Sequence, residues 1–296
     1  MQRPEPELPG HADPIRDNRS GAAILDIARA FVGARLAAAP LAAFPGTLPA
    51  DLSTAYAVQN AALGLWQDRI VGWKVGLIPP PAQAALGAAR LAGPIFSRGL
   101  IESAAGPVNL AAIQGGFAAI EAELLVAAHA DAPAKKTQWT VAEAAEFAGE
   151  WHLGMEFAAS PLATINELGA AAVVCDFGNN SGIVLGPPLD SALIANPDQL
   201  IYETKIDGRP VGFASAAALP GGPLEALRFV LGHLAERGRS LCAGQWVSTG
   251  AITGVHQIFS GQHGSIELIG HGRIDVRVNA AVAAGAQIAT GRRETS

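Results

Sequence analysis

The sequence is organised around the stretch AIEAELLV, residues 119–126, in which Glu121 and Glu123 interrupt an apolar run. Side chains of a β-strand alternate between its two faces, so a strand would place both glutamates on one face and the apolar residues on the other. In a helix the same spacing would turn the two acids about 200° apart. A strand therefore predicts two adjacent carboxylates that need a cation or water. A solvated strand face is the plain alternative, because exposed glutamate is common.

The composition is that of a globular protein with a sparsely charged surface. Half of the 296 residues are hydrophobic and 16% are charged, which argues against a disordered chain. So few charges suggest burial between subunits, and we expect a homo-oligomer. The formal net charge is −6, without a dense block of lysine and arginine, which disfavours nucleic acid and anionic membranes as partners. A small-molecule partner is expected.

The cysteine count and the absence of a long apolar run predict a cytoplasmic protein. Cys175 and Cys242 are the only cysteines, and their spacing fits no zinc pattern, although one buried disulfide between them stays open. No apolar run reaches about 18 residues, and the proline-rich start lacks the apolar region of a secretory signal. Residues 1–20 are predicted to be a disordered tail, because their composition cannot offset the entropy lost on ordering.

Beyond the tail, the patterns predict a helical segment followed by a β-rich domain. Residues 21–70 are expected to be helical: apolar residues follow helical spacing up to Ala38, and Asp51 is suited to cap a second helix. Residues 71–296 are expected to form the catalytic domain. Short strand patterns prevail there, so the predicted fold class is α+β with a curled sheet.

Local signals place several elements in this second segment. Thr140 and Glu143 form the pattern of a capping box, and Asp207-Gly208 is a hairpin turn signal. A clear helix runs from Pro223 to Gly238. The stretch 171–188 is predicted to be two apolar strands around a polar turn.

Two further strand patterns carry charges that face away from their apolar side. In IVGWKVGL, residues 70–77, Lys74 stands between Gly72 and Gly76, and glycine lets a ligand or another backbone approach closely. The alternative is an edge strand whose lysine resists aggregation. In HLGMEF, residues 152–157, Glu156 alternates with apolar residues. It supplies a third carboxylate.

Five segments, in this order, resemble the fumarylacetoacetate hydrolase superfamily, specifically its hydratase and decarboxylase branch. They are Gly72-Trp73-Lys74-Val75-Gly76-Leu77, Pro94-Ile95-Phe96, Ile120-Glu121-Ala122-Glu123, Met155-Glu156-Phe157 and Ser248-Thr249-Gly250-Ala251. The resemblance covers roughly residues 22 to 290. It implies a mixed β-roll or distorted barrel preceded by helices, assembled as a homo-oligomer.

The resemblance also implies a metal site and a mechanism. Glu121, Glu123 and Glu156 would bind Mg²⁺ or Mn²⁺, and three carboxylates leave open positions on an octahedral ion. A 2-oxo acid substrate would chelate the ion, which would stabilise the dienolate formed from it. Lys74 would assist as a cation or as a proton donor and acceptor, its ammonium made more acidic by burial and by the ion.

Other polar residues are weaker candidates. Ser248, Thr249 and Gly250 are predicted to contact the substrate carboxylate, with a plain strand-end turn as the alternative. His152 shares the predicted face of Glu156 and is suited to orient it, although a structural histidine is the default. Asp176 is suited to ordering its own turn. Gln59 and Asn179 are further candidates to reach the site, and the alternative for each is a buried amide that satisfies backbone groups.

The sequence departs from the family pattern in two places that bear on the reaction. Ile95 stands where family hydratases often carry an aspartate, and Phe157-Ala158-Ala159-Ser160 replaces a segment that is commonly Asp-Ser-Arg after the glutamate. Hydration of 2-hydroxypenta-2,4-dienoate to 4-hydroxy-2-oxopentanoate therefore needs another base. Decarboxylation of 2-oxohex-3-enedioate needs none, so Ile95 favours it.

We place hydration first, because it covers more of the variety of the family, and decarboxylation second. Hydrolysis of a C–C bond comes third, because the early part of the chain offers no convincing His-Glu dyad. An alternative of another class is a non-catalytic barrel that binds a small molecule. The complete set of three acids argues against it.

Overall fold

The computed structural model describes residues 14–103 and 106–284, with side chains from residue 21 onward. Residues 1–13 of the predicted tail lie outside the described part. The first helix, α1 (Pro14–Ala37), begins within the segment that was expected to be tail. The second helix, α2 (Leu52–Leu65), begins as predicted after Asp51, whose side chain accepts a hydrogen bond from the Thr54 backbone N–H at 2.7 Å.

The larger sheet has eight strands in mixed orientation, seven of them in the order β2-β1-β10-β5-β6-β7-β3, and β11 pairs with β5. The pairs β1–β10 and β3–β7 are parallel and the other pairs are antiparallel. Its strands are β1 (Ile70–Leu77), β2 (Arg90–Phe96), β3 (Leu100–Glu102), β5 (Phe117–Ala128), β6 (Ala148–Ser160), β7 (Asn180–Leu189), β10 (Trp246–Ser248) and β11 (His256–Gln257).

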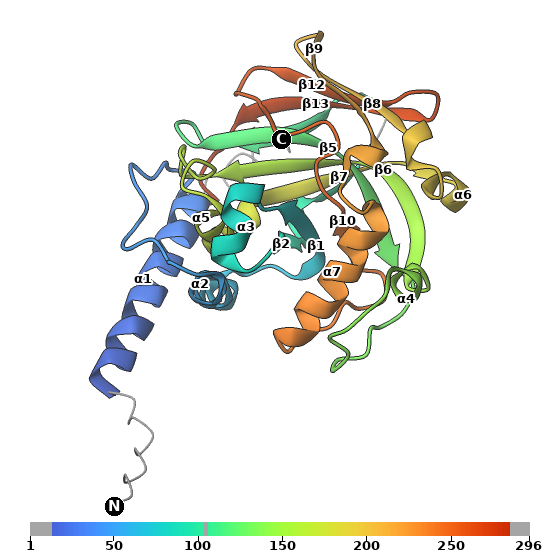
Figure 1. The fold of residues 1–296 in the computed structure, drawn as a ribbon. Helices are drawn as coiled ribbons and strands as arrows, with labels where there is room; N and C mark the ends of the chain where they lie inside the picture. The colour runs from blue at the N-terminus through green and yellow to red at the C-terminus, as the bar shows by residue number, and fades with distance from the viewer. Residues whose placement is uncertain (1–13, 104–105, 285–296) are drawn as a thin grey trace, which may run out of the picture.

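A second sheet of five strands has the order β4-β13-β12-β8-β9 and lies above the larger sheet in Figure 1. Its strands are β4 (Val108–Ala112), β8 (Ile201–Ile206), β9 (Arg209–Ser215), β12 (His263–Leu268) and β13 (Gly272–Ala280). The predicted hairpin joins β8 and β9. Asp207 and Gly208 both have positive φ, 49° and 76°, as a type I′ turn requires.

The main hydrophobic core forms between the two sheets and decides which way the glutamates point. Its members include alternate residues of β5, such as Ile120, Ala122 and Leu124, together with Ile266 and Val276 of the second sheet. Since alternate side chains of a strand face opposite ways, the glutamates of β5 project from the other face of the larger sheet. This confirms the predicted α+β architecture.

Helices cover the ends of the larger sheet. A second core joins α1 and α2 to α5 (Ala170–Cys175), and α4 (Val141–Ala145) packs beside α7 (Pro223–Glu236) at the lower right of Figure 1. The capping box at Thr140 and Glu143 is present, but α4 ends early because β6 begins at Ala148. The remaining helices are α3 (Pro80–Leu86), α6 (Ser191–Ile194) and the 3-10 turns Ser97–Gly99, Phe177–Asn179, Pro197–Gln199 and Ala216–Ala218.

The stretch 171–188 was only half correctly predicted. Its second part is β7, but the apolar run before the polar turn is helix α5, not a strand. All six residues of α5 are buried against the N-terminal helices, and a short run that is buried on every side shows no period that separates helix from strand.

Cys175 and Cys242 are free thiols, so the disulfide that the sequence left open does not form between them. Within residues 14–103 and 106–284, none of the helices combines the length and the apolar character that a bilayer crossing requires.

Candidate metal centre

Three carboxylates meet because β5 and β6 pair in one particular register. Glu121 lies directly opposite Glu156, and Glu123 lies opposite Gly154. Directly opposed residues of an antiparallel pair project from the same face, so all three glutamates lie on the face turned away from the core. One oxygen of each lies within 4.8 Å of the others, and the three side chains are between 0 and 5% exposed.

One carboxylate oxygen of Glu123 and one of Glu156 accept hydrogen bonds from the protein, and the second oxygen of each carboxylate is left free. Glu123 Oε2 accepts hydrogen bonds from the Ser248 hydroxyl and from the Gly250 backbone N–H, the latter at 2.9 Å. Glu156 Oε1 accepts one from Asn180 Nδ2 at 3.0 Å. Glu123 Oε1 and Glu156 Oε2 are buried without a hydrogen-bond partner among the described residues. Such orphaned carboxylate oxygens are costly unless a cation binds them, and hard oxygen ligands suit Mg²⁺, Mn²⁺ or Ca²⁺.

The electrostatics of the cluster likewise favour a cation. Burial first, and then the charge of Glu156, raise the pKa of Glu121 to about 8, against the opposing effect of Lys74. Burial and the two neighbouring carboxylates raise the pKa of Glu123 well above its ordinary value, although hydrogen bonds from Ser248 and Gly250 oppose the shift. Like charges that are desolvated together repel, and a divalent ion would relieve that repulsion.

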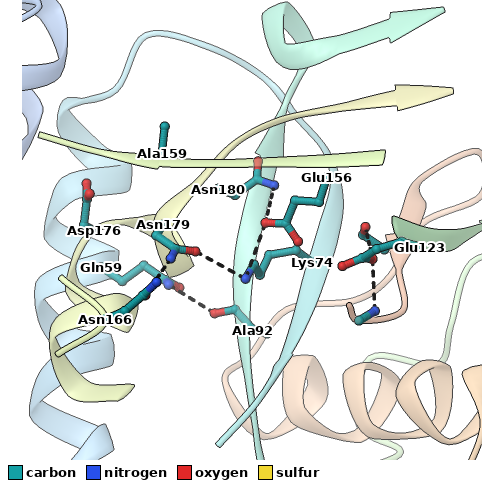
Figure 2. A network of polar contacts seen from close by, with 12 residues as sticks. Gln59, Lys74, Ala92, Glu123, Glu156, Ala159, Asn166, Asp176, Asn179 and Asn180 are labelled. Carbon is teal, nitrogen blue, oxygen red and sulfur yellow. Dashed lines mark hydrogen bonds and ion pairs between the residues drawn. The ribbon is translucent and has the colours of Figure 1, made fainter. Parts of the chain in front are cut away.

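Lys74 reaches this cluster across a strongly curled sheet. Strands β1 and β6 are separated by β10 and β5, so about 14 Å would separate them in a flat sheet. Nevertheless Lys74 Nζ lies 3.4 Å from Glu156 Oε1 (Figure 2). Lys74 is 4% exposed and β1 is flanked on both sides by other strands, so the edge-strand interpretation of this lysine is wrong.

The glycines on either side of Lys74 allow the neighbouring backbone and the cavity to come close to β1, as the sequence suggested. A Cβ on Gly72 would lie 2.3 Å from the carbonyl oxygen of Trp246 in the neighbouring strand, and Gly76 lines the cavity described below. Burial acts on the Lys74 ammonium in the expected direction, and the effect of the ion's charge stays a prediction. Burial lowers the pKa of Lys74, but the three carboxylates together outweigh it and raise this pKa above its ordinary value.

A left-handed turn presents two amides that the sequence did not clearly mark as a pair. Phe177, Gly178 and Asn179 have consecutive φ values of 56°, 68° and 52°, a conformation that costs free energy for residues other than glycine. The turn directs the Asn179 amide oxygen to Lys74 Nζ at 3.4 Å and is followed by Asn180, which binds Glu156 (Figure 2). Asn166, which sequence reasoning missed, accepts a hydrogen bond from Asn179 Nδ2 at 3.0 Å.

The carboxylate cluster and Lys74 adjoin a cavity of about 490 Å³, although Glu123 and Glu156 are not among the described residues that line it. Lys74 and Glu121 line it directly, as do the amides Asn166 and Asn179. Helix α5 forms one wall through Ala170 and Val173, and β1 and β2 contribute apolar side chains. The site therefore joins a candidate metal cluster to a space that admits a small molecule.

The structure places the predicted substrate contacts behind the carboxylates. Ser248 and Gly250 both donate to Glu123, and the Thr249 hydroxyl donates to the carbonyl oxygen of Leu124 at 2.9 Å. None of the three is among the described residues that line the cavity. In this arrangement Ser248 and Gly250 hold the Glu123 carboxylate and Thr249 holds the neighbouring backbone. A direct contact with substrate stays a prediction.

Of the weaker candidates, only Asn179 reaches the cavity. Gln59 donates to the backbone carbonyls of Ala92 and Val174, at 3.2 and 3.0 Å. His152 Nδ1 lies 2.8 Å from the carbonyl oxygen of Gly186. Asp176 accepts two hydrogen bonds from Arg35 and so anchors α1, which is a tertiary contact and not only a turn-internal one.

Ile95 shares the face of Lys74, because Lys74 pairs with Gly93 two residues earlier on β2. It is fully buried in a small apolar cluster with Leu125 and Ile183, the residue opposite Glu156. Where related hydratases were expected to carry an acid, this chain has hydrocarbon next to the carboxylates.

Solved structures share this architecture over most of the chain, although no family model matches the sequence. A 4-oxalocrotonate decarboxylase from Pseudomonas putida G7, complexed with calcium and acetate, matches with a TM-score of 0.70 at 22% identity, over 87% of this chain and 97% of that chain. The same enzyme complexed with magnesium and adipate gives 0.70 at 21% identity, over 86% and 97%.

A fumarylpyruvate hydrolase from Pseudomonas aeruginosa, in complex with Mn²⁺ and pyruvate, matches with a TM-score of 0.53 at 15% identity, over 72% of this chain and 91% of that chain. These matches confirm the fold that the sequence resemblance predicted, a mixed β-roll or distorted barrel preceded by helices.

Proposed function

We propose that this chain, which has the fold of the fumarylacetoacetate hydrolase superfamily, is a divalent-metal-dependent lyase that hydrates an unsaturated 2-oxo acid of the 2-hydroxypenta-2,4-dienoate type. The observation that carries the proposal is the meeting of three buried carboxylates with Lys74 beside one cavity, which Lys74 and Glu121 line. The solved structures of the same fold support it, since their ligands are a divalent cation together with acetate, adipate or pyruvate.

The residues of this chain divide the chemical work among them. Glu121, Glu123 and Glu156 would hold a divalent cation, whose positive charge would favour negative charge on the 2-oxo oxygen of the substrate. Lys74 lines the cavity, and without the ion the three carboxylates outweigh burial and raise its pKa. It is therefore placed to donate a proton to the substrate and to take one back. Asn179 orients its ammonium, and the apolar walls exclude water from the rest of the substrate.

Hydration takes first place because of the charges around the cavity. Among the described residues that line it, Lys74 is the only cation. The diacid 2-oxohex-3-enedioate would bring a second carboxylate, and a carboxylate buried without a partner is costly. A monoacid avoids this cost.

Decarboxylation of 2-oxohex-3-enedioate is the second candidate, and Ile95 favours it. The apolar cluster of Ile95, Leu125 and Ile183 supplies no base to activate water, whereas loss of CO₂ needs only an electron sink. The matched 4-oxalocrotonate decarboxylase structures add weight to this candidate.

One assay separates the two reactions. The purified protein with Mg²⁺ or Mn²⁺ is given each substrate, and loss of the dienol absorbance and release of CO₂ are followed separately. We expect loss of dienol absorbance, formation of 4-hydroxy-2-oxopentanoate and little CO₂. Rapid CO₂ release would favour the decarboxylase, and no turnover of either substrate would count against both.

The alternative of a non-catalytic binding barrel is tested by calorimetry. Titration with Mn²⁺ is expected to show one site in the wild type and none in Glu123→Ala. Equal binding by both proteins, or no binding by the wild type, would defeat the proposed metal dependence.

A further inference from the structure

The cavity changes in character between its floor and its mouth. At the floor, Lys74 and Glu121 are 4% and 5% exposed. At the mouth, Leu77 and Val255 line the same cavity and are 42% and 51% exposed. Exposed large hydrophobic side chains that gather at a cavity entrance are a surface suited to an apolar ligand group.

The wall between floor and mouth is apolar as well. Leu91 of β2 and Val173 of α5 are buried there, 3% and 8% exposed. Among the described residues that line the cavity, Lys74 and Glu121 are the only ionisable ones. The amides Asn166 and Asn179 also line it, and they are neutral and hydrogen-bonded to each other. A charged group at the distal end of a ligand would find no counter-ion.

The volume exceeds what a five-carbon acid fills. About 490 Å³ corresponds to roughly sixteen molecules of liquid water, about twice the number of non-hydrogen atoms in a five-carbon 2-oxo acid. The head group and a bound ion occupy the floor, so the unfilled space lies along the apolar walls and the mouth.

We propose that the substrate of this chain is a 2-oxo acid with an uncharged hydrocarbon tail longer than that of a five-carbon acid, and that Leu77, Val173 and Val255 bind this tail. The inference rests on the proposed function, because it places the oxo acid head over the carboxylates. It deepens that function by naming the group that the rest of the cavity recognises. Val255 and Leu77 act as specificity-determining residues at the entrance.

Binding of saturated acids tests the proposal without any turnover. Protein loaded with Mn²⁺ is titrated calorimetrically with 2-oxopentanoate, 2-oxooctanoate and 2-oxooctanedioate. Each buried methylene is worth about fourfold in affinity, so 2-oxooctanoate is expected to bind at least tenfold more tightly than 2-oxopentanoate. The diacid is expected to bind at least tenfold more weakly than 2-oxooctanoate, because its second carboxylate lacks a partner.

A charge placed at the mouth should invert this preference. Val255→Lys is expected to weaken binding of 2-oxooctanoate and to strengthen binding of 2-oxooctanedioate, with unchanged affinity for Mn²⁺. Val211→Lys is the matched control, because Val211 on β9 is 42% exposed and is not among the residues that line the cavity. It should leave both affinities unchanged.

The possible failures are distinguishable. A protein that binds Mn²⁺ but none of the three acids would overturn the proposed function and the tail with it. A protein that binds 2-oxopentanoate as tightly as 2-oxooctanoate, or that prefers the diacid, would overturn only the proposal of a hydrocarbon tail. A preference that Val255→Lys and Val211→Lys leave equally intact would remove Val255 from the binding of the tail.

Discussion

Asn180 holds Glu156 by one oxygen and thereby leaves the other oxygen for a cation. We expect Asn180→Ala to lower the affinity for Mn²⁺ about ten- to a hundredfold, because a ligand without its supporting hydrogen bond loses orientation. Calorimetric titration measures the effect. Asn109→Ala is the control, since the Asn109 side chain accepts a hydrogen bond from Asn279 Nδ2 on an exposed surface. Equal affinities in the two variants would show that Asn180 does not support the site.

Binding of a divalent ion should release protons at neutral pH. The pKa of Glu121 is about 8 in the metal-free chain, because of burial and the charge of Glu156. Below that pH the free protein carries a proton that must leave before the carboxylate binds a metal. The affinity for Mn²⁺ should therefore rise as the pH rises from about 6.5 to 8, by up to tenfold per unit from this one group. Titrations in two buffers of different ionisation enthalpy count the protons.

At least one proton per ion is expected at pH 7. A carboxyl with its ordinary pKa would release almost none, so an affinity that stays constant across this range would show that Glu121 is already ionised.

The glutamates were predictable from sequence because alternation along a single strand fixes their common face. Glu121 and Glu123 follow that rule without any knowledge of tertiary structure. Glu156 lies on another strand, so only the family resemblance joined it to them, because its place depends on the register of β5 and β6. Asn180 and Asn166 were not predictable as partners of the site. Their roles depend on the left-handed turn and on a loop. The direction of a side chain in a turn or loop cannot be inferred from a repeating sequence pattern.

At the scale of elements, the turn Phe177–Asn179 connects α5 to β7 and is packed tightly against β2. A Cβ on Gly178 would lie 2.9 Å from the Cα of Gly93 and 3.3 Å from Lys74 Cδ. Gly178→Ala is therefore expected to lower the free energy of unfolding by more than the left-handed backbone alone costs, about 1 to 2 kcal/mol. It should also displace Lys74 and reduce turnover. Denaturant unfolding and the dienol assay measure the two effects.

Gly87→Ala is the matched control for this substitution. Gly87 has nearly the same φ, 64°, but nothing lies within 4 Å of the position of its Cβ. Gly87→Ala should lower the free energy of unfolding only by the cost of the left-handed backbone, and it should keep full activity. Equal losses of stability and activity in the two variants would show that the contact with Gly93 and Lys74 is unimportant.

Strands in which apolar and polar residues alternate, or which glycines interrupt or end, were predicted well. The helical structure of α5 was not predicted. Strand β1 matches its predicted range, Ile70–Leu77, and the β8–β9 hairpin turns at the predicted pair. Helix α5 consists of small and β-branched residues that are buried on all sides, so the choice between helix and strand is made by packing against α2 and not by sequence period.

For the whole molecule, the cluster of carboxylates is suited to binding a metal ion but lowers the stability of the fold when no ion is bound. At an ion concentration of about 100 times Kd, Mn²⁺ should stabilise the wild type by about 2.7 kcal/mol, or roughly 5 °C in Tm. Glu123→Gln should gain nothing from Mn²⁺. Without the ion it should be at least as stable as the wild type, because it removes one of the buried carboxyls that repel each other.

Thermal unfolding of both proteins, with Mn²⁺, without it and with a chelator, would show which protein is the more stable in each condition. A variant that is less stable than the wild type in both conditions would indicate that Glu123 acts mainly through its hydrogen bonds with Ser248 and Gly250.

A curled sheet was predicted from the sequence, but the extent of the curl that brings β1 near β6 was not. Lys74 meets Glu156 only because β1, β10, β5 and β6 bend toward one another, and the bend arises from packing against the second sheet and the helices. The sequence resemblance predicted that these residues belong together, but alternation alone does not specify how far apart the strands lie.

The pairing of β5 with β6 has a consequence for folding. A slip of this pair by one residue would turn every side chain of the moving strand to the opposite face, so one strand would bury its glutamates in the core. Only the native register assembles three carboxylates around one point. An ion that binds there therefore selects the register of the two central strands, and a divalent metal added during refolding should favour correct strand alignment.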